Sequence, residues 1–358
     1  MTAGIVALLE RRLRDRPFAG ARIYVSRNGR CLVDEAFGEA RPGVAMCPQT
    51  VVHLSCAGKP LLAAVVLSLV EAGLIALADP VHRHLPGFET GGKGAVTVDD
   101  VLSHAGGFRF FDGPGPYLDS FGGFLRRVMS TTLEPDWRPG VDQGYHYETG
   151  WYVLAALTEA KLGVPYDDAI ADVVLKPLGM RSTWATMSRA TYQAVSHQLA
   201  VPSFVQHGVV RRSPFLISAS ACRTRCPSYG YFGTIDDLAR FYEAAIAGLD
   251  SAADFPLAPA TLRLMTTSAR GPVQDRTWKA EYAYSRGFYR GLAGTWGYGK
   301  RWSPSSFGMS GLVGHTVAAA DPQTGVVVAA SFGALADSGD DIARLTDHLY
   351  DTAMADTR

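Results

Sequence analysis

Residues 53–64 read HLSCAGKPLLAA and open a long apolar stretch that continues to residue 80. Its composition predicts a buried helix that begins after Lys59 and ends near Gly73. Cys56 and Lys59 stand three positions apart at the start of this helix. We therefore expect both side chains to lie on the same side of the helix, one turn apart.

A thiol in this position has unusual chemistry. The amino-terminal end of a helix carries partial positive charge, and the Lys59 ammonium adds to it, so both stabilise a thiolate at Cys56. A thiolate is a nucleophile, and the backbone N–H of Cys56 would help to hold an oxyanion. Free cysteines are more often small core residues, so both interpretations stay open at this point.

Strand patterns lie near both ends of the chain. Residues 21–38 alternate around Asn28-Gly29, which predicts a β-hairpin, and residues 315–320 and 326–332 predict two strands joined by a turn. Helical patterns open the chain at Ile5–Leu13, follow Thr234 over residues 235–248 and close the chain over residues 340–355. Between these parts, the sequence shows helices and loops with little strand signal.

The order of these elements predicts an α+β fold. Residues 1–50 and 226–358 are expected to form one antiparallel sheet flanked by helices, built from both chain ends. Residues 51–225 are expected to form an inserted, mostly helical lobe. We expect the active site to lie between the two.

The composition excludes several classes of protein. The 358 residues include 34 basic and 34 acidic side chains, so no net positive charge is available for a nucleic acid. The first apolar run is too short for a signal peptide, and no run approaches a membrane span, so we expect a cytoplasmic protein. Five cysteines are an odd, sparse set that favours reduced thiols.

No metal or cofactor is expected. Cys222 and Cys226 lack a second pair of Cys or His residues at zinc-binding spacing, so no metal site is expected there. For the same reason, the pair His82 and His84 is not expected to bind a metal. His104, in the Gly-rich segment LSHAGGF, is expected to stabilise a turn. The balanced charge permits oligomers without indicating any.

Several segments together resemble the serine β-lactamase and penicillin-binding-protein superfamily, most closely its class C β-lactamase and esterase branch. The family's first motif is S-x-x-K at a helix start, where this chain has Cys56 and Lys59. Four further segments resemble family motifs in the same order: 102–108, 138–157, 231–241 and 307–331. The resemblance covers nearly the whole chain and implies a β-lactamase/transpeptidase-like fold.

The departures from the family bear on the chemistry. Cys56 replaces the nucleophilic Ser. When the segment is aligned on Thr149-Gly150, His146 takes the place of the family's catalytic Tyr and Glu148 takes the place of its Asn. A one-residue slip in the alignment would instead put Tyr145 in the Tyr position. Met309 replaces the usual Lys or His of the third motif.

These changes suggest a thiol-based site. We expect Cys56 to attack an acyl carbon, His146 to shuttle the proton, Lys59 to stabilise the thiolate and Glu148 to orient His146. Family logic assigns the oxyanion hole to the backbone N–H groups of Cys56 and Leu312.

Loss of the family cation at Met309 argues against β-lactams, because that cation commonly holds a substrate carboxylate. We expect a neutral, partly apolar small-molecule acyl substrate, for which a carrier-bound or thioester donor is one option. The expected substrate contacts are Met309, Ser310, Gly311, His315, Phe108 and Tyr229.

The leading hypothesis is an acyl-transfer enzyme with an acyl-Cys intermediate, acting as an acyltransferase, cyclase, thioesterase, esterase or amidase. Thioesters undergo aminolysis more readily than hydrolysis, which favours a biosynthetic transferase or cyclase. The alternative is a catalytically inactive binding protein of the same fold, since several family side chains have changed. Retention of Lys59 beside a thiol favours the enzyme.

Overall fold

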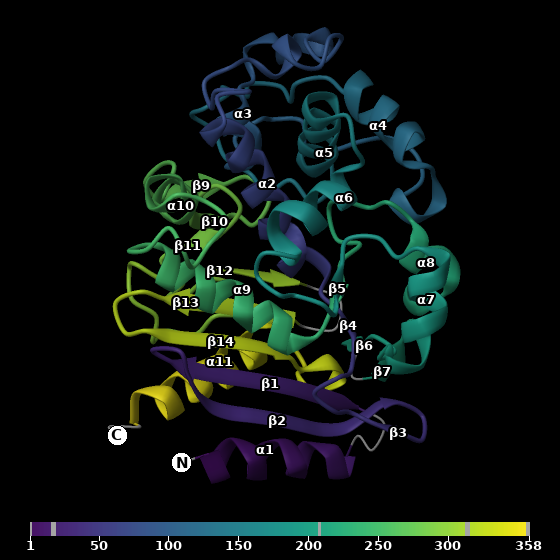
Figure 1. Ribbon diagram of the computed structural model, residues 1–358, viewed down its shortest axis with the longest axis vertical. Helices are drawn as coiled ribbons and strands as arrows, with labels where there is room; N and C mark the ends of the chain where they lie inside the picture. Colours follow the sequence, from purple (N-terminus) through teal and green to yellow (C-terminus); the bar gives the residue numbers. More distant parts are fainter. Residues whose placement is uncertain (1, 16–18, 207–208, 312–315, 356–358) are drawn as a thin grey trace.

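The computed structural model describes residues 2–15, 19–206, 209–311 and 316–355. The described residues form an antiparallel sheet whose strands come from both ends of the chain (Figure 1). In chain order the strands are β1 (Gly20–Arg27), β2 (Arg30–Arg41), β3 (Val44–Ala45), β9 (Val273–Asp275), β10 (Ala280–Tyr284), β11 (Tyr289–Arg290), β12 (Phe307–Gly311), β13 (Thr316–Asp321) and β14 (Val326–Ser331).

Their spatial order is β3-β2-β1-β14-β13-β12-β11-β10-β9. The first and last strands of the chain therefore lie side by side inside the sheet, where β1 pairs with β14. This arrangement confirms the predicted α+β fold with an antiparallel sheet. The division into lobes at residues 50/51 and 225/226 stays our proposal.

The hairpin between β1 and β2 is confirmed at Asn28-Gly29. Arg27 pairs with Arg30 across the turn, and both central residues have positive φ, 52° for Asn28 and 73° for Gly29. Two-residue hairpin turns that match the strand twist require such values, which Asn and Gly adopt most easily.

Helices cover both faces of the sheet and fill the upper part of the molecule (Figure 1). The α-helices are α1 (Thr2–Asp15), α2 (Lys59–Glu71), α3 (Val98–Leu102), α4 (Phe121–Ser130), α5 (Thr149–Leu162), α6 (Tyr166–Ile170), α7 (Arg189–Val195), α8 (Ala219–Arg223), α9 (Ile235–Gly248), α10 (Pro259–Thr266) and α11 (Gly339–Ala355). Helix α9 lies in front of the sheet and α11 behind it, and both contact β1 and β14.

Helix α9 has the predicted bounds, since the Thr234 side chain accepts a hydrogen bond from the Asp237 amide at 3.3 Å and caps the helix. Helix α2 is buried over most of its length, because α5, α6 and α10 all pack against it. No helix in the described ranges is both long and apolar enough to cross a membrane.

The middle of the chain contains more strand than its sequence predicted. Residues Val52–His53 (β4), Phe232–Gly233 (β8) and Thr183–Trp184 (β5) form a small second sheet, and Ser203–Gln206 (β6) pairs with Val209–Arg212 (β7). Strands of two to four residues are too short to leave a clear alternating pattern in a sequence. The strand β4 matters for the site, since it leads directly to Cys56.

Candidate functional site

Cys56 lies in a short 3₁₀ helix, η1 (Ser55–Gly58), that runs into α2. The chain enters this turn through Ser55, whose φ of 54° is in the left-handed region. Such a conformation costs energy in a residue with a Cβ and is found mainly where the surroundings hold it in place. The side chain of Cys56 is 6% exposed and that of Lys59 is fully buried.

Lys59 is the centre of the site. Its Nζ donates hydrogen bonds to the Cys56 Sγ at 3.4 Å, to the Tyr145 hydroxyl at 2.7 Å and to the Tyr147 carbonyl at 2.9 Å. These contacts match the three N–H donors of an ammonium. Burial lowers the pKa of Lys59, and the nearby charges of Cys56 and Glu148 oppose this effect. Lys59 therefore loses its proton more easily than an exposed lysine does.

Tyr145, not His146, is the residue that reaches Lys59. The Tyr145 hydroxyl also donates to the Met309 Sδ at 3.8 Å. Burial, together with the charge of Cys56, raises the pKa of Tyr145 well above its ordinary value. Tyr145 therefore stays a neutral phenol, which can donate a proton. Of the two residues that the sequence left open, Tyr145 is the one whose side chain contacts Lys59.

The predicted role of His146 as proton shuttle for Cys56 is wrong in this geometry. Its Nδ1 contacts the Gly144 carbonyl at 2.8 Å, and its Nε2 faces the Phe108 amide at 3.4 Å. Both ring nitrogens are thus engaged by backbone groups. Burial lowers the pKa of His146 to about 3, so the ring is neutral. Glu148 consequently has no histidine proton shuttle to orient, which corrects that prediction as well.

His104 supports the same loop. Its Nδ1 accepts a hydrogen bond from the His146 amide at 3.0 Å, and its ring lies 4.5 Å from the Tyr145 ring. His104 itself has a left-handed φ of 60°. It is therefore part of the turn that positions Tyr145.

Asp275, which the sequence analysis missed, ties this loop to the sheet. The carboxylate is fully buried at the end of β9 and accepts a hydrogen bond from the Tyr145 amide at 2.9 Å. It also accepts from the Tyr284 hydroxyl at 2.8 Å and from the amides of Thr277 and Trp278 at 2.7 and 2.8 Å. A lone Asp at the end of a short strand carries no sequence signal for this role.

Strand β12 brings Gly311 against the backbone of Cys56. A Cβ on Gly311 would lie 2.5 Å from the Leu54 carbonyl oxygen and 3.3 Å from the Cys56 amide nitrogen. Glycine is therefore required for this close approach. Leu312 and His315, predicted for the oxyanion hole and for substrate contact, lie outside the described residues.

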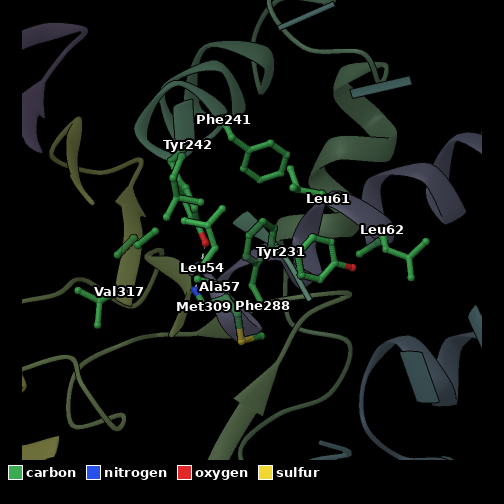
Figure 2. Packing of buried hydrophobic residues seen from close by; sticks show 14 of the residues in the cluster. Leu54, Ala57, Leu61, Leu62, Tyr231, Phe241, Tyr242, Phe288, Met309 and Val317 are labelled. Atoms are coloured by element: carbon green, nitrogen blue, oxygen red, sulfur yellow. Dashed lines mark hydrogen bonds between the residues drawn. The ribbon is translucent and has the colours of Figure 1, made fainter. Parts of the chain in front are cut away.

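The neighbours of Gly311 differ from their predicted roles. Met309 is fully buried behind Tyr145, in the same apolar cluster as Leu54 and Ala57, so it is no open substrate surface (Figure 2). Ser310 lies on the other face of the strand, beside Gly297. The prediction that Met309 contacts substrate is corrected accordingly, and the same prediction for Ser310 stays a prediction.

Aromatic side chains form one side of the site. Tyr117 packs edge-on against Tyr229 at 5.4 Å and against Phe215 at 6.0 Å. Its hydroxyl lies 3.0 Å from the Nε2 of His53, a residue of β4 that the sequence analysis did not single out. Burial lowers the pKa of His53 to about 4, so this contact involves a neutral imidazole.

Several of these phenols lie near the thiol. Burial raises the pKa values of Tyr117, Tyr147 and Tyr229, and the charge of Cys56 adds to the effect in each case. Tyr229 as a substrate contact stays a prediction. Phe108 offers a substrate no open surface, because it is 1% exposed and packs against His146 and Phe88 in the core.

In the described ranges, no group of three or more His, Cys, Asp or Glu side chains is arranged so that it could hold a metal ion. Cys222 and Cys226 are buried thiols, and His84 contacts Asp79 at 2.9 Å. What the site offers is a thiol, an amine and a phenol in contact. These groups can form a nucleophile and move its proton.

Comparisons with known proteins identify the family of this chain. The family model described as Beta-lactamase matches residues 5–349. The chain is 30% identical over 278 residues to Esterase EstB of Burkholderia gladioli, which is 68% of this chain and 70% of that protein.

Solved structures share the fold. A penicillin-binding protein homologue from Caulobacter crescentus has a TM-score of 0.78 at 24% identity and covers 98% of this chain and 97% of its own. EstCE1, described as a hydrolase with promiscuous acyltransferase activity, has a TM-score of 0.79 at 21% identity. The match covers 97% of this chain and 98% of EstCE1. The family model and the similarity to Esterase EstB show that this chain belongs to the beta-lactamase family.

Proposed function

We propose that this protein is an acyl-transfer enzyme in which Cys56 forms a covalent acyl intermediate. The observation that carries the proposal is the position of the Lys59 Nζ, 3.4 Å from the Cys56 Sγ and 2.7 Å from the Tyr145 hydroxyl. The similarity to Esterase EstB supports a hydrolase or acyl-transfer activity. The catalytic set is therefore Cys56, Lys59 and Tyr145.

The first half of the reaction transfers the acyl group to sulfur. Lys59 takes the thiol proton, and the Cys56 thiolate attacks the acyl carbon. An S–C bond forms, and the bond from that carbon to the leaving group breaks. Tyr145 gives its phenol proton to the leaving group and regains a proton from Lys59. The lowered pKa of Lys59 and the raised pKa of Tyr145 favour the return of a proton from Lys59 to Tyr145.

The oxyanion that develops on the acyl oxygen needs nearby N–H donors. We propose the backbone N–H of Cys56 as one donor, since the first amides of a helix have no acceptor within that helix. Gly311 comes close to the Cys56 nitrogen, so strand β12 runs next to this N–H. This position of β12 supports the assignment. In the second half, an acceptor attacks the thioester carbon, and the C–S bond breaks.

For the acyl donor we propose a neutral, partly apolar compound, either free or delivered as a thioester. The support is the uncharged aromatic side formed by Tyr117 and Tyr229. Aromatic rings supply apolar contact area without demanding charge on the ligand. A biosynthetic role fits such a donor, since a thioester favours transfer over hydrolysis.

Intact-mass spectrometry after incubation with an activated acyl thioester tests the proposal. The wild-type chain is expected to gain one acyl group, which peptide mapping places on Cys56. Lys59→Ala is expected to lose the adduct. Cys31 is exposed and Cys47 half-buried, so both serve as internal controls for random acylation. If Cys56 gains no more label than these two, the protein is a binding protein without this chemistry.

A further inference from the structure

One long stretch of the sequence contains no acidic residue. Residues 173–235 include seven lysines and arginines but not one aspartate or glutamate, whereas the whole chain has 34 basic and 34 acidic side chains. Surfaces of soluble proteins usually mix charges of both signs. The segment 173–235 is therefore expected to give one part of this neutral chain a positive surface.

The described part of this segment folds onto one side of the molecule. Figure 1 shows α7, α8, β6 and β7 gathered at the right of the view. The Met187 amide donates a hydrogen bond to the Cys222 carbonyl at 2.9 Å, which holds the chain before α7 against α8. The Tyr192 hydroxyl donates to the Ile217 carbonyl at 3.1 Å and ties α7 to the turn that precedes α8. The basic side chains of these elements are thus brought onto a common side.

Three of the basic side chains have no acidic partner. Lys176 and Arg225 pair with carboxylates from outside the segment. Arg189 of α7, Arg211 of β7 and Arg223 of α8 are exposed, and none of them forms an ion pair within the described part of the chain. Their charges are therefore free to interact with another molecule.

A fourth arginine reaches the same side from the main sheet. The guanidinium of Arg41, at the end of β2, donates hydrogen bonds to the Ser196 carbonyl at 3.1 Å and to the His197 carbonyl, just after α7. These acceptors carry no charge, so the positive charge of Arg41 adds to that of the segment. The basic surface, as we name it, consists of Arg41, Arg189, Arg211 and Arg223.

The basic surface continues into the aromatic side of the site. Phe215 follows Arg212, the last residue of β7, by three positions and is 47% exposed. Its ring lies 6.0 Å from the ring of Tyr117, whose hydroxyl lies 3.0 Å from the Nε2 of His53. His53 precedes Cys56 by three residues. A chain of contacts therefore leads from β7 to the segment that carries the thiol.

We infer that the basic surface docks an acidic carrier protein, which delivers the acyl group to Cys56 as a thioester. This inference rests on the proposed function, because it names the source of the acyl donor. The four guanidinium groups belong to β2, α7, β7 and α8. Groups spread over four elements suit the extended surface of a protein better than one small anion. Arginine pairs with carboxylates through two N–H groups, and complementary charge speeds and orients the encounter of two proteins.

The transfer to Cys56 is then an exchange of thioesters. Lys59 takes the proton of the Cys56 thiol, and the thiolate attacks the acyl carbon on the carrier. A C–S bond to Cys56 forms, and the C–S bond to the carrier breaks. Tyr145 protonates the departing thiolate and regains a proton from Lys59. The products are acylated Cys56 and a carrier with a free thiol, so no oxidant or further reactant is needed.

Binding tests the docking surface apart from the chemistry. The probe is a small acidic acyl carrier protein that bears a phenylacetyl group as a thioester, and its Kd is measured with Cys56→Ala, which cannot be acylated at this position. Adding Arg189→Ala, Arg211→Ala and Arg223→Ala together should raise the Kd at least about tenfold. Raising the salt from about 0.05 M to about 0.5 M should weaken binding before these changes and have little effect after them.

A matched control removes the same number of charges elsewhere. Arg11 and Arg14 of α1 and Arg240 of α9 are exposed arginines outside the basic surface. Changing these three to Ala should leave the Kd unchanged. In the enzyme with Cys56 intact, the changes at Arg189, Arg211 and Arg223 should lower kcat/KM for the acylated carrier at least about tenfold. They should not alter kcat/KM for phenylacetyl-N-acetylcysteamine, a small uncharged thioester.

The possible outcomes separate the two proposals. A Kd that the changes in the basic surface do not raise, or that the control raises as much, overturns the inference. Binding to phosphatidylserine vesicles, but not to the carrier, that depends on Arg189, Arg211 and Arg223 also overturns it and assigns the surface to a membrane. If the carrier binds through these arginines but neither thioester acylates Cys56, the proposed function is overturned and only the docking of the carrier stands.

Discussion

The Lys59 Nζ lies 2.7 Å from the hydroxyl oxygen of Tyr145, although 86 positions separate the two residues in the sequence. The same nitrogen contacts the Cys56 Sγ at 3.4 Å. Lys59 therefore links the thiol to the phenol, and a proton can pass between them through one amine. This relationship makes Tyr145 the proton donor of the proposed reaction and leaves His146 outside it.

Tyr145→Phe is expected to slow acyl transfer by about 10²–10⁴-fold, the usual contribution of a positioned acid or base. The ring would keep its contacts, including the stacked Tyr289 at 5.9 Å, so the fold should be retained. Rates of product release with an activated ester, together with thermal melting, check this. Tyr166→Phe removes a hydroxyl from another buried tyrosine, in α6, and should leave the rate unchanged. Equal rates for wild type and Tyr145→Phe would contradict the mechanism.

Cys56→Ser tests which partner serves the nucleophile. A histidine tuned to a thiol would leave a serine variant inactive. The structure instead places Lys59 and Tyr145 on the nucleophile, the pair that accompanies Ser in the family. We therefore expect Cys56→Ser to retain ester cleavage within about 10²-fold of wild type, limited by the weaker acidity of a hydroxyl. Cys56→Ala should have none, and a serine variant as inactive as Ala would argue against this pair.

Asp275→Asn should loosen the loop that carries Tyr145. The NH₂ group of Asn would face N–H groups that now donate hydrogen bonds to the Asp275 carboxylate. We therefore expect the free energy of unfolding to fall by about 2–3 kcal/mol. The rate constant of acyl transfer should also fall, because Tyr145 is anchored through its backbone amide. Urea denaturation and steady-state kinetics measure the two effects.

Asp321→Asn provides the matched control for that variant. Asp321 is also fully buried, and it accepts hydrogen bonds from Ser303 and from the Tyr350 hydroxyl at 2.8 Å. It lies in the sheet, away from Tyr145. We expect similar destabilisation with unchanged kinetics at temperatures where the variant is folded. A parallel kinetic loss in Asp321→Asn would show that Asp275 acts only through stability.

Stability should fall with acid below about pH 6.5. Burial lowers the pKa of His53 to about 4 and that of His146 to about 3, whereas both titrate near 6.5 in an unfolded chain. Between those values the unfolded chain binds protons that the folded chain does not. Stability is therefore complete above pH 6.5 and decreases as the pH falls, by roughly 1.4 kcal/mol per pH unit for each histidine.

Urea denaturation at several pH values measures this slope. His146→Gln should reduce the slope, since one buried titrating group is removed. His197→Gln alters an exposed histidine and should leave the slope as it is in the wild type. A pH-independent stability between pH 4 and 6.5 would contradict the burial of neutral imidazoles.

Local patterns determined much of the fold from sequence alone. Asn28-Gly29 specifies the first hairpin because few residue pairs tolerate two positive φ values in succession. Thr234 specifies the start of α9 because its side chain satisfies a free amide three residues later. The spacing of Cys56 and Lys59 placed their side chains together because one helical turn spans that distance.

Tertiary structure alone decided which neighbour in Tyr145-His146 faces Lys59. These residues lie in an irregular loop, where no periodicity distinguishes a residue from the next. The choice depends on Asp275, which is 130 positions away and holds the Tyr145 amide, and on His104, which holds the amide of His146. Hydrogen bonds between segments so far apart form only in the folded chain. Sequence could therefore name the candidates for the site, while packing selected among them.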